Sequence, residues 1–114
     1  ESLQTLSVQH NYLSELPDIE PLDRLVRLCL RGNYLRSVTA TSLNRRRQLE
    51  KLDVGDNFIG DLHQIFNGSA LVRDLNLDSN QISRLDDNVF QGTNAGRIIL
   101  AVNKIENISE GAFS

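Results

Sequence analysis

Histidine and cysteine, which often catalyse reactions or bind metals, are few in this chain, and the more numerous aspartates and glutamates are scattered along the sequence. The two histidines, His10 and His63, and the single cysteine, Cys29, do not have the ligand spacing of a zinc site. There is also no G-x-S-x-G motif, no phosphate-binding glycine loop and no H-E-x-x-H motif. We therefore expect no enzymatic activity, no metal and no other cofactor.

The charge pattern argues against nucleic-acid and membrane partners. The net charge is −3 over 114 residues, so no global basic field is present. The run Arg45-Arg46-Arg47 is short and is typical of a solvated loop. The apolar run from Ile98 to Val102 is too short to span a bilayer. We expect no nucleic-acid partner and no direct membrane insertion by this segment.

Two features bear on the cellular compartment and point in different directions. The sequons Asn67-Gly68-Ser69 and Asn107-Ile108-Ser109 make Asn67 and Asn107 candidate glycosylation sites, although such tripeptides also arise by chance. A single cysteine excludes an internal disulfide, and a free, exposed thiol is more typical of a reducing compartment. The sequence permits a secretory origin without demonstrating it.

The elements that must position these residues follow from a pattern that recurs five times. Each copy contains an asparagine, and these are spaced 22, 24, 23 and 23 residues apart: Asn11, Asn33, Asn57, Asn80 and Asn103. An alternating apolar pair precedes each one: Leu6/Val8, Leu28/Leu30, Leu52/Val54, Leu75/Leu77 and Ile98/Leu100. Further apolar residues follow two and five positions later, as in the most regular copy, Val72 to Leu85.

This pattern predicts a short strand, a turn at the asparagine and a return along the other side of a coil. One coil cannot bury its own apolar side, so neighbouring coils stack and share a core. The strands should form one parallel sheet, with little regular helix elsewhere. Each asparagine should turn inward and bond backbone groups that the turn leaves unpaired. We interpret these five asparagines as a structural ladder.

The motif resembles that of the leucine-rich repeat family. Within it, the spacing and the phenylalanines Phe90 and Phe113, which we expect in the core, are similar to the class found in animal extracellular receptors and adhesion proteins. The resemblance implies an α/β solenoid, a right-handed superhelix with a concave parallel sheet and a mostly irregular or short-helical convex side. We expect one domain of about five repeats, part of a longer ectodomain and without caps: residues 3–24, 25–48, 49–71, 72–94 and 95–114.

The family resemblance also implies a function. It favours a protein-binding module of an extracellular recognition, innate-immune or cell-adhesion protein, located outside the cell or at its surface. An intracellular, cytoplasmic scaffold or regulator remains an alternative, as does a structural spacer within a larger solenoid. The partner would be another protein, bound through the concave face or its edge, and self-association is left open.

The informative surface is the concave sheet, because residues that alternate with the buried leucines must point outward. Charge is segregated there, basic on the second strand, mixed on the third and acidic on the fourth. The partner-binding candidates on this face are Arg27, Arg31, Lys51, Asp53, Asp74, Asn76 and Asp78. They form either a docking face or a solvated face with lateral salt bridges, such as one between Lys51 and Asp74.

Aromatic residues directly follow the first three asparagines. Tyr12, Tyr34 and Phe58 should form a row at one edge of the sheet, with neighbours roughly 5 Å apart. Such a row is either a binding hot spot or a cover over the asparagine turns. Cys29 should face solvent beside Arg27 and Arg31, as a reactive or an idle thiol.

Overall fold

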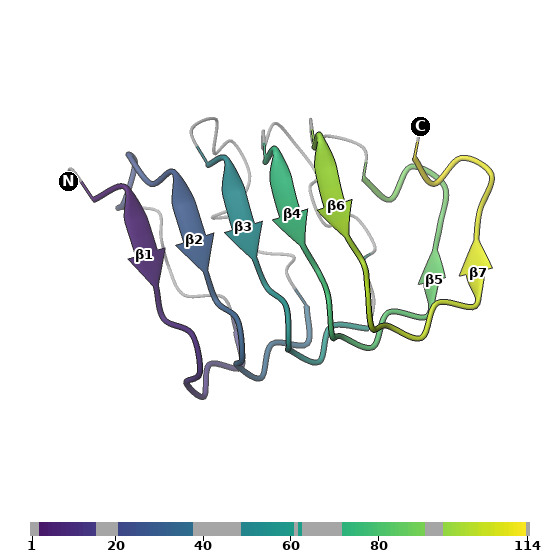
Figure 1. Cartoon of the computed structure of the whole chain (residues 1–114), viewed down its shortest axis with the longest axis horizontal. Coiled ribbons are helices and arrows are strands. Elements are labelled where there is room, and N and C mark those ends of the chain that lie inside the picture. Colours follow the sequence, from purple (N-terminus) through teal and green to yellow (C-terminus); the bar gives the residue numbers. More distant parts are fainter. Residues whose placement is uncertain are drawn as a thin grey trace.

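The computed structural model describes residues 3–15, 21–37, 49–60, 62, 72–90 and 95–113. The regular elements of these residues are strands: β1 (Thr5–Ser7), β2 (Arg27–Cys29), β3 (Lys51–Asp53), β4 (Asp74–Asn76), β5 (Arg84–Leu85), β6 (Arg97–Ile99) and β7 (Asn107–Ile108) (Figure 1). Predictions that rest on His63, Asn67 and the Arg45-Arg46-Arg47 run fall outside the described residues.

The main sheet has five parallel strands in the order β1-β2-β3-β4-β6, side by side along the long axis (Figure 1). The register is the one that the asparagine alignment predicts. Leu6 is opposite Leu28, Leu28 opposite Leu52, Leu52 opposite Leu75 and Leu75 opposite Ile98. A slip of one residue would turn these side chains to the opposite face, so burial of one face fixes the register. The predicted solenoid with a parallel sheet is confirmed.

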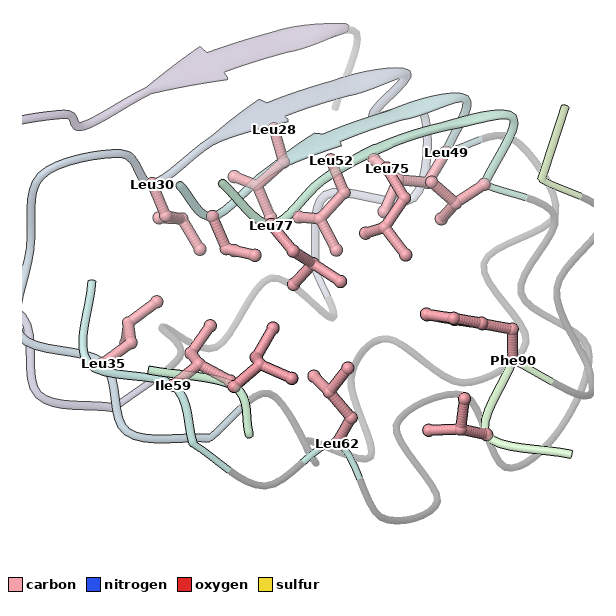
Figure 2. Packing of buried hydrophobic residues seen from close by; sticks show 14 of the residues in the cluster. Leu28, Leu30, Leu35, Leu49, Leu52, Ile59, Leu62, Leu75, Leu77 and Phe90 are labelled. Carbon is pink, nitrogen blue, oxygen red and sulfur yellow. The ribbon is translucent and has the colours of Figure 1, made fainter. Parts of the chain in front are cut away.

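The core lies behind this sheet and is built from the repeated apolar positions (Figure 2). The strand leucines Leu28, Leu52 and Leu75 are at most 2% exposed. Leu35 and Ile59, two residues after their asparagines, are fully buried on the returning side. Each such side chain contributes roughly 1.5–3 kcal/mol by its removal from water. The core therefore runs continuously from coil to coil.

The buried asparagines connect each coil to the one before it. The side-chain amide of Asn57 donates to the carbonyls of Val54 (3.0 Å) and Gly55 (2.9 Å) in its own turn and of Leu30 (3.1 Å) in the preceding coil. Its Oδ1 accepts the N–H of Leu35 at 3.0 Å. One buried side chain thus satisfies backbone groups of two coils, which explains why asparagine, with both donors and acceptor, recurs here.

Asn11 departs from the expectation that all five asparagines turn inward. It is exposed, and its amide donates only to the carbonyls of Val8 and Gln9 in its own turn. The other four asparagines also donate to a carbonyl of the preceding coil, and the described residues include no coil before Asn11.

The residue before each asparagine has a left-handed backbone. The φ angles are 61° at His10, 76° at Gly32, 52° at Asp56, 56° at Ser79 and 56° at Val102. Glycine adopts this conformation without strain, and aspartate tolerates it, but a β-branched residue does so only at a cost. The turn therefore imposes the same backbone conformation on five different residue types.

A second, two-stranded sheet was not predicted from the sequence. β5 pairs in parallel with β7, with Leu85 opposite Ile108 (Figure 1). Leu85 is 1% exposed, whereas Ile108 and Phe113 are each 60% exposed. The expectation of a core position is therefore wrong for Phe113, which stacks on the buried Phe90 with ring centroids 5.6 Å apart. Among the described residues, a neighbouring coil packs on one side of each of these two side chains.

Candidate functional site

The outward face of the five-stranded sheet carries a hollow of about 330 Å³. We call this surface the open sheet face. Residues of all five strands line the hollow, and the outward ones among them are Thr5, Arg27, Cys29, Lys51, Asp53, Asp74, Asn76, Arg97 and Ile99. The alternation of the strands thus brings together most of the outward candidates, as the period of two requires.

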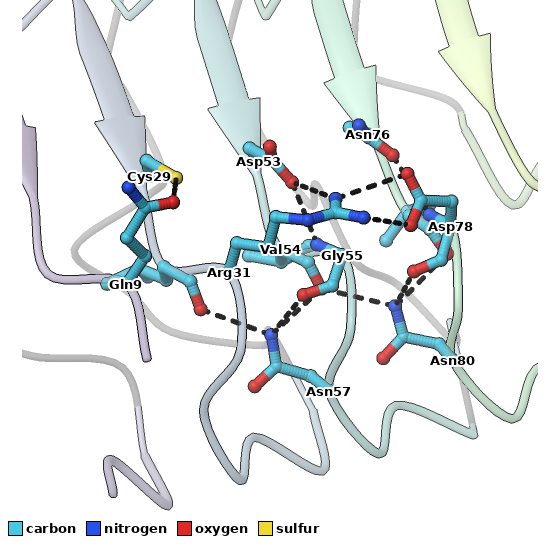
Figure 3. Close-up of polar contacts among 12 residues, drawn as sticks. Gln9, Cys29, Arg31, Asp53, Val54, Gly55, Asn57, Asn76, Asp78 and Asn80 are labelled. Atoms are coloured by element: carbon cyan, nitrogen blue, oxygen red, sulfur yellow. Dashed lines mark hydrogen bonds and ion pairs between the residues drawn. The ribbon is translucent and has the colours of Figure 1, made fainter. Parts of the chain in front are cut away.

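An arginine network crosses the carboxyl end of this face (Figure 3). Nη1 of Arg31 donates to Asp53 at 3.2 Å, and Nη2 donates to Asp78 at 2.7 Å. Nη1 also donates to the second oxygen of Asp78 at 3.2 Å, which makes that contact bidentate. Bidentate guanidinium–carboxylate pairs are the stronger kind of ion pair. Arg31, two residues after β2, therefore connects its coil to the last residue of β3 and to the turn that follows β4.

Gly55 allows Arg31 to reach Asp78. A Cβ at position 55 would overlap Nη1 of Arg31 and would lie 3.0 Å from Oδ1 of Asp78. Arg31, Gly55 and Asp78 each stand two residues before an asparagine, so they occupy one position in three successive repeats. That alignment, with opposite charges on either side of a glycine, was the signal that the sequence offered for this network.

The network shifts the ionisation of both partners. The hydrogen bond from Arg31 lowers the pKa of Asp78 below its ordinary value, and partial burial opposes this shift. The hydrogen bond to Asp78 raises the pKa of Arg31, with burial again opposing. Two short turns hold the acceptors in place, because the N–H of Gly55 donates to Asp53 at 3.0 Å and the N–H of Asp78 donates to Asn76 at 3.0 Å.

Other charges on the open sheet face are less constrained. Nζ of Lys51 lies 3.9 Å from Oδ2 of Asp74, and both side chains are well exposed. Such a pair contributes under about 1 kcal/mol. Among the described residues, Arg27 and Arg97 are exposed and have no ion pair. They are the charges most available to a partner.

Cys29 is half-buried on this face. Its Sγ lies 3.7 Å from Oε1 of Gln9 (Figure 3). The guanidinium of Arg31, which we expected beside the thiol, is engaged instead with Asp53 and Asp78. Within the part of the chain that the structure describes, no group of three His, Cys, Asp or Glu side chains is placed to hold a metal ion.

The three aromatic residues form a row beside the asparagine turns. The ring centroids of Tyr12 and Tyr34 are 5.7 Å apart, and those of Tyr34 and Phe58 are 5.8 Å apart. The residues nevertheless remain 80%, 47% and 45% exposed in that order. The rings pack on one another and also present apolar surface, so both interpretations of the row keep a physical basis.

Comparison with known proteins adds to this geometry. Residues 23–82 match a family model described as leucine rich repeat. This chain belongs to the leucine-rich repeat family. The leucine-rich repeat solenoid is a protein-interaction scaffold, and within the described residues no helix is long and apolar enough to cross a membrane.

One curated relative extends the similarity of this leucine-rich repeat chain beyond the family match. It is the mouse (Mus musculus) protein "Leucine-rich repeats and immunoglobulin-like domains protein 2", which is 26% identical over 105 residues. The aligned part covers 91% of this chain and 10% of the mouse protein. The leucine-rich repeat chain therefore spans about a tenth of the length of the relative that it matches.

Proposed function

We propose that this leucine-rich repeat chain is a protein-binding module of an extracellular recognition or adhesion protein and that it binds its partner through the open sheet face. The observation that carries the proposal is the hollow of about 330 Å³ that crosses all five strands of the sheet. Strand pairing fixes the backbone positions from which its outward side chains project, so little backbone entropy is lost when a partner binds.

The extracellular setting draws on the name of the mouse relative, which combines leucine-rich repeats with immunoglobulin-like domains. The exposed sequon residue Asn107 is compatible with that setting. The half-buried free thiol of Cys29 favours the second candidate, an intracellular scaffold. Glycan mass on Asn107 after expression in a secretory host supports the first candidate over the second.

The size of the face limits what it does alone. Five strands extend over roughly 20 Å at ordinary strand spacing. A standard interface buries about 800 Å² on each partner, which is more than this face provides. The open sheet face therefore contributes part of a larger contact, and Tyr12, Tyr34 and Phe58 at its edge are candidates to extend it.

An N-linked glycan introduced on the open sheet face, where it would block a partner sterically, tests the location of the binding surface. The single substitution Thr5→Asn completes an N-x-S sequon with Leu6 and Ser7 on the outward side of β1, at the hollow. A dimeric fusion of the chain is secreted and its binding to animal cells is measured. We expect the glycan at position 5 to abolish binding. Persistent binding by the fully glycosylated variant would exclude the open sheet face.

The sequon at Asn107 supplies the matched control for the glycan at position 5. It is exposed in β7, outside the five-stranded sheet, and does not line the hollow. Asn107→Gln removes a glycan of similar size at this second position. We expect cell binding to be the same with and without the glycan on Asn107. If cell binding rises when the glycan on Asn107 is removed, by as much as it falls when the glycan at position 5 is added, then any bulky sugar interferes, whichever face carries it.

A further inference from the structure

We infer that the open sheet face takes an acidic, extended segment of its partner, whose carboxylates are held by Arg27 and Arg97. The inference rests on the proposed function and names the chemistry of the partner. It follows from which charges on the face are already engaged within the chain and from the positions of those that are not.

The carboxylates of the face are occupied. Asp53 and Asp78 accept hydrogen bonds from Arg31, and Asp74 lies 3.9 Å from Lys51. A basic partner segment would have to displace Arg31 or Lys51 from these contacts before it gained its own. Because breaking a bidentate pair costs much of what the new pair returns, the face discriminates against basic segments.

The free charges are cationic. Arg27 and Arg97 line the hollow and are exposed, and the ion pairs recorded for the described part of the chain include neither of them. A guanidinium presents two parallel donors that match a carboxylate. These two arginines are therefore suited to receive acidic side chains without rearrangement of the face.

The register sets the distance between the two arginines. Arg27 is opposite Lys51, Lys51 is opposite Asp74, and Asp74 is opposite Arg97, so all four stand in one row across β2, β3, β4 and β6. Three strand spacings of about 4.8 Å place Arg27 and Arg97 roughly 14 Å apart at the backbone. The pair is thus a fixed, two-point binding element.

An extended segment that crosses the strands matches this distance. It rises about 3.4 Å per residue and alternates its side chains, so positions i and i+4 lie roughly 14 Å apart on the same side. Acidic residues at i and i+4 would meet Arg27 and Arg97. The residue at i+2 would lie over the Lys51–Asp74 pair, where a neutral polar side chain fits both charges. The open sheet face therefore selects extended segments with acidic residues at i and i+4 and a neutral polar residue at i+2.

Short threonine-rich peptides test the inference directly. One carries glutamate at i and i+4, one at i and i+1, and one carries lysine at i and i+4. Binding of each labelled peptide to the full chain is measured by fluorescence anisotropy at low ionic strength. We expect the i, i+4 glutamate peptide to bind at least about tenfold more tightly than the other two. Equal or tighter binding of the lysine peptide overturns the inference.

Substitutions on the chain complete the test. Arg27→Glu and Arg97→Glu should each weaken binding of the i, i+4 glutamate peptide by about tenfold or more. Arg24→Glu, the same charge change at an exposed residue that does not line the hollow, should change it by less than about twofold. Asp74→Asn should strengthen binding, because it removes the carboxylate that is the register partner of Arg97. Equal effects at positions 24, 27 and 97 overturn the inference.

Failure of the inference can be told apart from failure of the proposed function. If the glycan at position 5 abolishes cell binding while Arg27→Glu and Arg97→Glu leave it unchanged, the open sheet face binds a partner but not through these arginines. If cell binding is unaffected by the glycan at position 5 and by both arginine substitutions, both proposals are wrong. Loss of cell binding with all three variants, and not with Arg24→Glu, supports both.

Discussion

The guanidinium of Arg31 and the carboxylate of Asp78 meet at 2.7 Å, although the two residues lie 47 positions apart in the chain. Between them lies Gly55, whose missing side chain leaves the path open. Together with the Arg31–Asp53 contact, the Arg31–Asp78 contact joins three successive coils at the outward face of the sheet, on the side opposite the apolar core. It stabilises the solenoid and also withdraws Arg31 and Asp78 from any role as free binding charges.

Gly55→Ala should break this contact. The new methyl group would overlap Nη1 of Arg31, so the arginine must leave Asp78 or the coil must shift. We expect the free energy of unfolding to fall by roughly 1–2 kcal/mol, measured by urea denaturation. Gly60→Ala is the control, because its nearest neighbour, the carbonyl oxygen of Gln81, would be 3.7 Å away. An equal effect of the two substitutions would show that the contact contributes nothing.

The contribution of the Arg31–Asp78 contact should depend on pH. Arg31 lowers the pKa of Asp78 in the folded state below its ordinary value of 3.8. A lowered pKa gives stability that is present above the unfolded value and is lost as pH falls through the folded value. Arg31→Gln should therefore be destabilising at pH 7, and its difference from the unmodified chain should shrink below about pH 4.

The control for this pH series is Lys51→Gln, which removes a positive charge from an exposed pair with 3.9 Å between its atoms. Urea midpoints of the three proteins are compared from neutral to acidic pH. A destabilisation by Arg31→Gln that stays constant down to about pH 3 would argue that the arginine acts by packing and not through the carboxylate.

Substitution of asparagine by alanine should lower the free energy of unfolding by different amounts at different positions of the asparagine ladder. Asn57→Ala leaves the buried N–H of Leu35 without its acceptor and removes one of two asparagine donors from the carbonyls of Leu30 and Val54, which keep Asn33 and Asn80. We expect a loss of about 1.5–3 kcal/mol in the free energy of unfolding. Asn11→Ala, at an exposed turn, should cost under about 1 kcal/mol. Similar losses for both would mean that the cost comes from the local turn alone.

Val102→Asn should stabilise the protein. Val102 has a φ angle of 56° and is 76% exposed, so its β-branched side chain bears the strain of a left-handed backbone without gaining burial. Asparagine tolerates this conformation, and we expect a gain of about 0.5–1.5 kcal/mol. Differential scanning calorimetry measures the change. A lower melting temperature than that of the unmodified chain would exclude strain at this turn.

Alanine at the middle of the aromatic row separates its two interpretations. Tyr34→Ala removes both ring contacts, whereas Tyr12→Ala removes one. If the row is a cover, the losses in unfolding free energy should be about 1–3 and 0.5–1.5 kcal/mol respectively. If it is a binding edge, cell binding falls while the melting temperature is unchanged. We expect the stability effect, because centroids 5.7 and 5.8 Å apart place the rings in contact.

The repeat pattern was sufficient to locate the five strands of the main sheet. The expected pairs around Leu28, Leu52 and Leu75 became β2, β3 and β4 with the predicted register. The two-residue pairing of β5 with β7 was missed, because neither segment shows the alternation that marks a strand. The exposure of Ile108 and Phe113 was also missed, since a repeat position predicts burial only where coils stand on both sides.

By itself, the sequence determined the architecture of this protein, because an apolar period shared by successive coils can be buried in only one register. The tertiary structure alone decided which charges of the open sheet face are free. Asp53 and Asp78 are neighbours of Arg31 only after the coils have stacked, and the space above Gly55 exists only between side chains of other coils. Which partner a long charged side chain contacts in a neighbouring coil depends on how far it extends and on its rotamer. The repeat pattern carries no information on either.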